Sequence, residues 1–304
     1  MPPSVTCKAP ASMMLFGEHS VLRKGKAVVA AVDVWLTVAI GSRNDDTVEV
    51  VSCFGKESCS LKNISLSPNL PFVRAALVLF SPLFSSGCSI TITSDIDPTM
   101  GLGSSAAVSV AMITALSAWT EQTWSREKIL KTTISLIRSV QGCGSGADVA
   151  SIVYGGVIAF DGKTEHATAL SPSLPLVAQY CGYKKPTPEV VSLVKAREKD
   201  FPEIFSSLFS SIDLVTNEAL SAIQCEDLHR LGTLMNSADA LLQALGVGTG
   251  ELSEICWRFR EEPTIFGAKI SGSGLGDCAI ALGASQQKCL PISVSPVGVA
   301  LECL

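Results

Sequence analysis

Apolar segments of strand and helix length alternate in the first half of the chain. Short apolar runs, several of them alternating with polar residues, predict β-strands at residues 5–16, 27–40, 47–53, 89–94, 153–160 and 167–170. Longer segments, apolar on one face or throughout, predict α-helices at residues 69–79, 106–119 and 125–139. Such an alternation of strands and helices is typical of a mixed α/β fold.

The second half has longer helices and fewer strands. A strand is predicted at residues 176–182, and strands return through residues 269–282. Between them lie three helical segments, at residues 188–199, 203–224 and 225–245. The Pro- and Ser-rich stretch 171–175 is the best candidate for a boundary. We therefore expect a two-lobed α+β protein with an N-terminal lobe of residues 1–172, a C-terminal lobe of residues 173–304, and a site between them.

Composition narrows the class of protein. The chain has 304 residues, 47% of them hydrophobic, which is ample for a core. A net charge of −5 without a long basic run argues against nucleic acid or an anionic membrane as a partner. The apolar run 25–40 contains Lys26 and Asp33, so we interpret it as paired strands and not as a membrane span.

The cysteine content and the N-terminal sequence indicate the cellular compartment of the protein. The 11 cysteines lack the paired spacing of zinc sites, and many lie in apolar contexts typical of reduced core cysteines. No charged region precedes an apolar stretch at the start, so no signal peptide is predicted. We expect a cytoplasmic protein.

The chemistry-bearing residues begin with a glycine-rich turn, residues 98–107, which runs into the apolar helix. Glycines let the backbone approach an anion closely, and a helix N-terminus favours negative charge. The pattern predicts a phosphate cradle, although no Gly-Lys-Ser/Thr follows, as a Walker A loop would require. The alternative is a tight strand-to-helix connection closed by a serine cap.

Two further glycine-rich segments support the cradle. In residues 141–150, three glycines and a serine precede Asp148, which is either a helix cap or a base placed beside the cradle, and an apolar strand is predicted at residues 151–160. Residues 266–282 form a glycine loop followed by an apolar strand, for which a simple β-hairpin is the alternative. Three such segments in one chain favour a single shared site.

Together these segments resemble the GHMP kinases, a family named for galacto-, homoserine, mevalonate and phosphomevalonate kinases. Residues 9–22 resemble the first family motif, the cradle the second, and the loop around Gly272 the third. Within the family, the first motif and residues 235–252 are similar to mevalonate kinases. Residues 141–150 and 276–278 are closer to phosphomevalonate kinases.

The resemblance implies a ribosomal S5 domain 2-like N-terminal lobe, a ferredoxin-like C-terminal lobe, and the use of ATP and Mg²⁺. It implies that Asp148 orients or deprotonates the accepting hydroxyl, and that Ser105 ligates magnesium while Ser104 donates to a phosphate. The implied ATP-binding residues are Pro98, Gly101, Leu102, Gly103, Ser104, Ser105 and Ala106. The implied acceptor-binding residues are Glu18, His19, Ser145, Thr187, Gly272, Ser273 and Gly274.

Some of these positions have plainer alternatives. His19 and Glu18 are equally consistent with a structural pair, and Thr187 with a helix cap. Two positions depart from the family. Ser12 stands where mevalonate kinases carry a lysine, and Ile137 stands where they carry a magnesium-binding glutamate. Lys8 lies four residues before Ser12, ~13 Å along an extended strand, so it is a poor substitute.

Three functions follow as hypotheses. The first is an ATP-dependent mevalonate kinase and the second a phosphomevalonate kinase, both acting on a small-molecule alcohol in isoprenoid biosynthesis. The third is a pseudokinase that binds ligand without turnover, because the family lysine and glutamate are missing. The state of assembly stays open, with a homodimer as one alternative.

Overall fold

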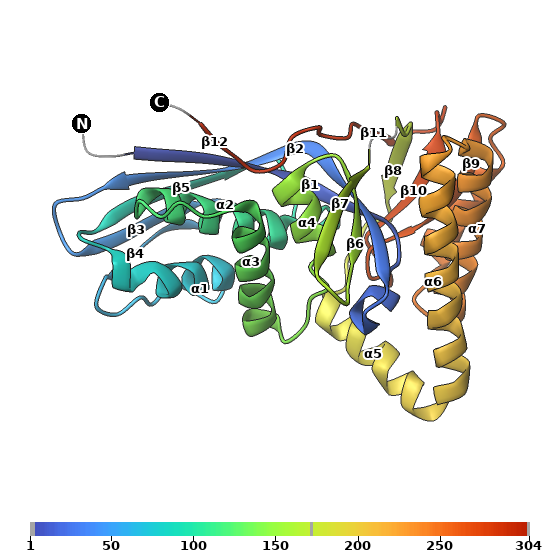
Figure 1. Ribbon diagram of the computed structural model, residues 1–304, viewed down its shortest axis with the longest axis horizontal. Coiled ribbons are helices and arrows are strands. Elements are labelled where there is room, and N and C mark those ends of the chain that lie inside the picture. Colours follow the sequence, from blue (N-terminus) through green and yellow to red (C-terminus); the bar gives the residue numbers. More distant parts are fainter. Residues whose placement is uncertain (1–3, 171–172, 303–304) are drawn as a thin grey trace.

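The computed structural model describes residues 4–170 and 173–302 and contains two β-sheets, each with its own helices (Figure 1). This arrangement confirms the predicted two-lobed α+β architecture. Part of the predicted boundary, residues 171–172, lies outside the described residues. No helix in the described ranges is both long enough and apolar enough to cross a bilayer.

The first sheet carries the N-terminal lobe. Its strands follow the order β12-β1-β2-β5-β3-β4, with β6 and β7 continuing from β2, and only the β3–β5 pair is parallel. The strands are β1 (Ser4–Phe16), β2 (Lys26–Ser42), β3 (Thr47–Ser52), β4 (Gly55–Ser60), β5 (Cys88–Ser94), β6 (Val157–Asp161), β7 (His166–Leu170) and β12 (Ala300–Glu302). The last of these brings the C-terminal end of the chain back to β1.

The predicted strand pair at residues 25–40 is wrong, because β2 is one strand of 17 residues. Its first part pairs with β6, its second part with β5, and residues 28–41 follow β1 with a bulge. The two charges that suggested a break are both accommodated. Lys26 is the exposed first residue, and Asp33 lies at a bulge between the pairs Pro10–Trp35 and Ala11–Val32.

The apolar helix α2 (Ser104–Trp119) is buried between β1 and β2 on one side and α1 (Pro71–Phe80), α3 (Arg126–Gln141) and α4 (Ala147–Tyr154) on the others. This environment explains why α2 lacks a polar face. The strand predicted from residue 151 is wrong, since α4 extends to Tyr154 and β6 begins only at Val157. A short buried helix and a buried strand are both uniformly apolar, so periodicity does not separate them.

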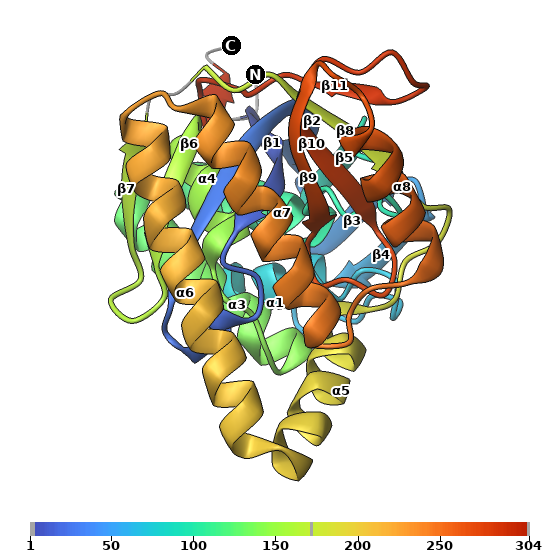
Figure 2. The same cartoon turned by 90° about the vertical axis from the view of Figure 1, so that its right-hand side faces the viewer.

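The second sheet has the order β11-β8-β10-β9 and carries the C-terminal lobe (Figure 2). Its strands are β8 (Leu176–Tyr180), β9 (Ile265–Ser271), β10 (Cys278–Gly283) and β11 (Leu290–Ile292). The helices are α5 (Thr187–Asp200), α6 (Pro202–Gln224), α7 (Leu228–Ala244) and α8 (Gly250–Arg260). The sequence analysis predicted neither α8 nor β4.

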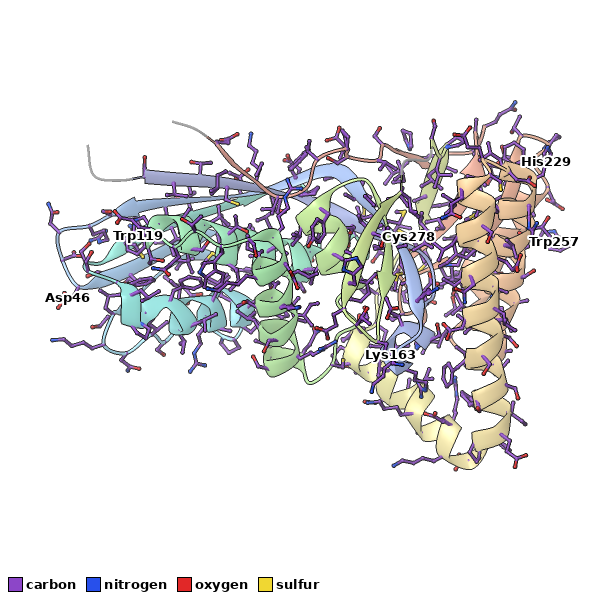
Figure 3. The ribbon with its side chains drawn as sticks, viewed as in Figure 1. Asp46, Trp119, Lys163, His229, Trp257 and Cys278 are labelled. Atoms are coloured by element: carbon purple, nitrogen blue, oxygen red, sulfur yellow. The ribbon has the colours of Figure 1, made fainter. Side chains whose placement is uncertain are left out.

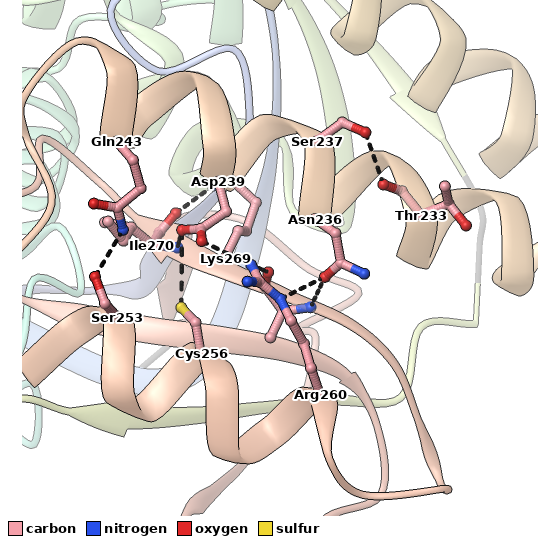
Figure 4. A network of polar contacts seen from close by, with 11 residues as sticks. Thr233, Asn236, Ser237, Asp239, Gln243, Ser253, Cys256, Arg260, Lys269 and Ile270 are labelled. Carbon is pink, nitrogen blue, oxygen red and sulfur yellow. Dashed lines mark hydrogen bonds and ion pairs between the residues drawn. The ribbon is translucent and has the colours of Figure 1, made fainter.

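A polar network fastens α7 and α8 to β9 (Figure 4). Asp239 of α7 accepts hydrogen bonds from Arg260 Nη2 at 2.7 Å and from the amide of Ile270 at 3.1 Å. Asn236 accepts from Arg260 Nε at 2.8 Å and from the amide of Ala268 at 3.0 Å. These bonds fix the backbone on both sides of Lys269, the strand residue that points toward the N-terminal lobe.

The two lobes are joined by polar contacts around the glycine loops. Cys278, labelled in Figure 3 near the middle of the molecule, directs its thiol to the carbonyl of Met100 at 3.1 Å. Ser271 Oγ donates to the carbonyl of Met14 at 2.8 Å. The cradle and the first motif therefore lie directly against the end of the C-terminal hairpin.

Candidate active site

A cavity of about 310 Å³ lies where the glycine-rich segments meet. Its wall combines the first motif, the cradle, the start of α4, the start of α5 and the β9–β10 loop. Most of the predicted site residues line it, namely Glu18, His19, Gly101, Gly103, Ser104, Ser105, Ala106, Ser145, Asp148, Thr187, Gly272 and Ser273. Segments up to about 250 residues apart in sequence are thus brought to one cavity, as the pattern indicated.

Three predicted site residues lie elsewhere. Pro98, the first residue of the cradle, is exposed, and Leu102 is part of the hydrophobic core. Leu102 still shapes the loop, since its carbonyl accepts a hydrogen bond from the amide of Ser12 at 3.1 Å. Gly274 is buried against the loop that follows α7. A Cβ added there would lie 2.5 Å from the carbonyl oxygen of Val247.

The glycine turn of the cradle ends at Gly103, which is the N-cap of α2 and has a backbone conformation in the left-handed region. Ser104 and Ser105 are the first two helical residues, and the helix has no side-chain cap hydrogen bond. The serine-cap alternative is therefore not what the structure has. The first amides of a helix have no partner within the helix, and at this end they face the cavity together with two hydroxyls.

Asp148 is the second residue of α4, after the N-cap Gly146, and its carboxylate does not cap the helix. Ser12 Oγ donates a hydrogen bond to Asp148 Oδ1 at 2.7 Å. Burial raises the pKa of Asp148 above its ordinary value, while the Ser12 hydrogen bond and the charge of Lys184 act in the opposite direction. A carboxylate with a raised pKa is a stronger base, which suits proton abstraction.

Ser12 gives a prediction for the pH dependence of activity. Replacing it with alanine removes a hydrogen bond that favours the charged carboxylate, so the pKa of Asp148 should rise further. Hydrogen bonds to charged groups contribute about 1.5–3 kcal/mol, so the acid limb of kcat/KM should move up by about one to two pH units. The control is Ser271→Ala, which removes a lobe-joining hydroxyl with no bond to Asp148 and should leave the acid limb in place.

Glu18 forms a buried ion pair with Lys269 of β9, whose ammonium also donates to the carbonyl of Ile270. His19 does not pair with Glu18. Its Nε2 lies 2.9 Å from the carbonyl oxygen of Ser273, and its Nδ1 is buried without a partner. Burial lowers the pKa of His19, so the ring is uncharged at neutral pH. Both residues tie the first motif to the C-terminal lobe beside the cavity.

The Glu18–Lys269 pair gives a prediction for stability. Glu18→Ala leaves a fully buried ammonium without its counter-charge, and breaking such a pair typically costs about 3–5 kcal/mol. Urea unfolding should show this loss in the free energy of unfolding. The double variant Glu18→Gln with Lys269→Met removes both charges and should lose clearly less. An equal loss in both variants would contradict a charge-based explanation.

The sequence analysis assigned no role to two charged residues of the cavity wall, Lys184 and Asp277. Lys184 Nζ lies 3.4 Å from Asp277 Oδ1. Burial raises the pKa of Asp277, and the ammonium of Lys184 opposes the rise. Asp277 lies within the third glycine-rich segment, residues 266–282, and Lys184 lies three residues before Thr187. Their proximity to each other appears only in the fold.

The side chains around the cavity indicate how a magnesium ion could be bound. No group of three or more His, Cys, Asp or Glu side chains within the described residues is arranged to hold a metal ion. Ile137, in place of the family glutamate, is an apolar part of the wall. Magnesium commonly binds through one or two protein oxygens plus substrate phosphates. The Ser105 hydroxyl and the cavity carboxylates fit an ion that arrives with a nucleotide, and not an ion held by the chain alone.

Comparison with known proteins identifies the family. Family models match residues 71–156, as the GHMP kinases N terminal domain, and residues 218–288, as GHMP kinases C terminal. The chain is 33% identical to the mevalonate kinase of Pyrococcus abyssi over 98% of this chain and 94% of that protein. It is 34% identical to the mevalonate kinase of Pyrococcus furiosus over 93% and 90% of the two chains.

Solved structures share the fold. The Methanococcus jannaschii mevalonate kinase superposes with a TM-score of 0.78 at 25% identity, covering 93% of this chain and 91% of that chain. A phosphomevalonate kinase of Streptococcus pneumoniae also has a TM-score of 0.78, but at 18% identity, over 92% and 93%, and so supports the fold alone. Cavity, sequence similarity and fold lead to one conclusion: the chain belongs to the GHMP kinase family.

Proposed function

We propose that this protein is a mevalonate kinase, which transfers the γ-phosphoryl group of ATP to a hydroxyl of mevalonate. The observation that carries the proposal is the half-buried carboxylate of Asp148, on the same cavity wall as the amides and hydroxyls at the start of α2. The choice of acceptor is supported by the near full-length similarity to mevalonate kinases of Pyrococcus.

The cradle provides the nucleotide half of the site. We assign the triphosphate to the amides of Gly101, Gly103 and Ala106, with the Ser104 hydroxyl as a donor to a phosphate oxygen. We assign Ser105 as the residue whose hydroxyl would ligate the Mg²⁺ that enters with ATP. When bound, magnesium offsets negative charge on the phosphate oxygens.

The chemical step uses Asp148. Its carboxylate accepts the proton of the acceptor hydroxyl as that oxygen forms a bond to the γ-phosphorus, while the bond from phosphorus to the bridging oxygen of ADP breaks. Ser12 orients the carboxylate through its hydrogen bond. His19, Ser145, Thr187 and Ser273 form the polar wall assigned to the acceptor.

The two other hypotheses rest on specific residues. Residues 141–150 and 276–278 favour phosphomevalonate kinase. A phosphorylated acceptor, however, adds negative charge to a cavity whose lining has Glu18, Asp148 and Asp277 but only one lysine among the described residues. Ser12 and Ile137 favour a pseudokinase. The retained base and cradle oppose it, because both parts needed for transfer are present.

A coupled assay of ADP formation with a panel of acceptors tests the proposal. With ATP and magnesium, mevalonate should give the highest kcat/KM, with phosphomevalonate and galactose well below it. An ATP-only reaction serves as the blank. Faster turnover of phosphomevalonate would overturn the choice of acceptor. ATP binding without turnover of any acceptor would favour the pseudokinase.

A further inference from the structure

The cavity has an unusual balance of charge for a site that receives a triphosphate. Of its three carboxylates, Glu18 is neutralised by Lys269, which leaves Asp148 and Asp277. His19 is uncharged at neutral pH because burial lowers its pKa. Lys184 is the one lysine or arginine in the cavity lining, as far as the described residues show. Within this lining, Lys184 is therefore the side-chain cation that can meet an incoming polyanion.

The backbone of Lys184 is anchored while its side chain is not enclosed. The amide of Asp277 donates to the carbonyl of Tyr183 at 2.9 Å, and the amide of Cys181 donates to the carbonyl of Asp277 at 3.0 Å. These bonds fix the segment that carries Lys184 to the β9–β10 loop. The side chain of Lys184 remains 29% exposed, so its ammonium can move within the cavity.

Asp277 holds this ammonium beside the cradle. Its backbone lies in the left-handed region, with φ of 68°, and its side chain is 6% exposed. A Cβ added to Gly101 would lie 2.7 Å from Asp277 Oδ1, so the carboxylate lies directly against the glycine turn. Oδ1 makes no hydrogen bond to any residue that the structure describes, and Lys184 Nζ lies 3.4 Å from it. The ion pair therefore lies at the predicted phosphate site.

Neither Ser12, at the position of the family lysine, nor the nearby Lys8 can supply a cation to the transferring phosphoryl group. Ser12 is fully buried, neutral and bonded to Asp148. Lys8 pairs with Glu302 on the surface, 2.6 Å away. A phosphoryl transfer site without a side-chain cation would leave the charge on the transferring group without a protein counter-charge.

We propose that Lys184 supplies the cation that the Ser12 position lacks, by contacting the γ-phosphoryl group of ATP, and that Asp277 is its positioning residue. On ATP binding the ammonium moves from Asp277 Oδ1 to a γ-phosphate oxygen. During transfer, the acceptor oxygen bonds to phosphorus, ADP departs, and the proton of the acceptor hydroxyl passes to Asp148. Throughout this step Lys184 offsets the negative charge of the phosphoryl oxygens. The catalytic part of this inference rests on the proposed function, whereas the contact with ATP does not depend on the acceptor.

The experiment compares Lys184→Met with Lys185→Met, a neighbouring lysine outside the cavity lining. Calorimetry without acceptor measures the affinities for ATP and ADP, both with magnesium, and the coupled assay measures kcat with mevalonate. Loss of a charged contact to the γ-phosphate should reduce the ratio of ATP to ADP affinity about tenfold, and kcat should fall about 10²–10³-fold. Lys184→Arg retains the charge and should restore most of the affinity ratio.

The outcomes distinguish the contact of Lys184 with the γ-phosphate from the proposed identity of the acceptor. A reduced affinity ratio in Lys184→Met, with Lys185→Met unchanged, supports the γ-phosphate contact even if mevalonate proves not to be the acceptor. An unchanged ratio overturns the inference, including the case where kcat falls, because a purely structural role would weaken ATP and ADP alike. Thermal unfolding of all three variants checks that the fold is intact.

Discussion

Asp148→Asn is expected to lower kcat by about 10²–10⁴-fold while ATP affinity stays close to that of the unmodified protein. Asparagine keeps the shape of the side chain and still accepts the hydrogen bond from Ser12, but it cannot take the proton of the acceptor. The measurement combines the coupled assay with calorimetry of ATP binding.

The same variant should not lose stability. Burial raises the pKa of Asp148 in the folded protein, so this carboxyl opposes folding increasingly as pH rises through its unfolded and then its folded value. Removing the charge should therefore leave Tm unchanged or raise it at neutral pH and above. Glu189→Gln is a matched control, an exposed acid in the first turn of the neighbouring helix α5, and should change neither kcat nor Tm. Turnover of Asp148→Asn within a few fold of normal would exclude Asp148 as the base.

Gly103→Val should abolish most of the affinity for ATP. Gly103 has φ of 68°, which a β-branched residue adopts only with strain, and an added Cβ would lie 2.1 Å from Ser12 Oγ. The cradle must then shift away from β1, which displaces the amides at the start of α2. Calorimetry should show a loss of about 10²-fold or more, because several charge-assisted hydrogen bonds are misplaced together.

The Gly55→Val variant is a control that distinguishes the backbone strain of a valine at positive φ from the displacement of the cradle. Gly55 also has a positive φ, of 107°, but lies in the β3–β4 hairpin, where an added Cβ has nothing within 4 Å. It carries a similar backbone cost and should leave ATP affinity unchanged. Circular dichroism confirms that both variants fold. Unimpaired ATP binding by the folded Gly103→Val variant would show that the cradle does not bind the nucleotide.

The parts of the site that the sequence predicted are those encoded locally. The turn before Ser104, the turn before Asp148 and the loop at Gly272 each combine glycine with small polar residues over a few positions. A backbone that must approach an anion requires such residues wherever it lies in the chain. The occurrence of three such segments in one chain predicted a shared site, and the fold brings residues of all three to one cavity.

The parts that the sequence did not predict depend on tertiary contacts. The second half of α4 was assigned to a strand because its buried surface leaves no polar face to show a helical period. The long strand β2 was divided because Asp33 appears as an interruption, although a bulge accommodates it. The pairing of Lys184 with Asp277, and of Glu18 with Lys269, joins residues 93 and 251 positions apart, so no local pattern encodes it.

Identification of the reaction product tests the central claim most directly. Purified protein is incubated with ATP, magnesium and mevalonate, and the products are examined by phosphorus NMR and mass spectrometry, with Asp148→Asn in parallel. We predict a phosphate monoester of mevalonate, formed in equal amount with ADP by the unmodified protein and nearly absent with the variant. ADP formation without this ester, or ester formation that persists in Asp148→Asn, would contradict transfer to mevalonate by this carboxylate and cradle.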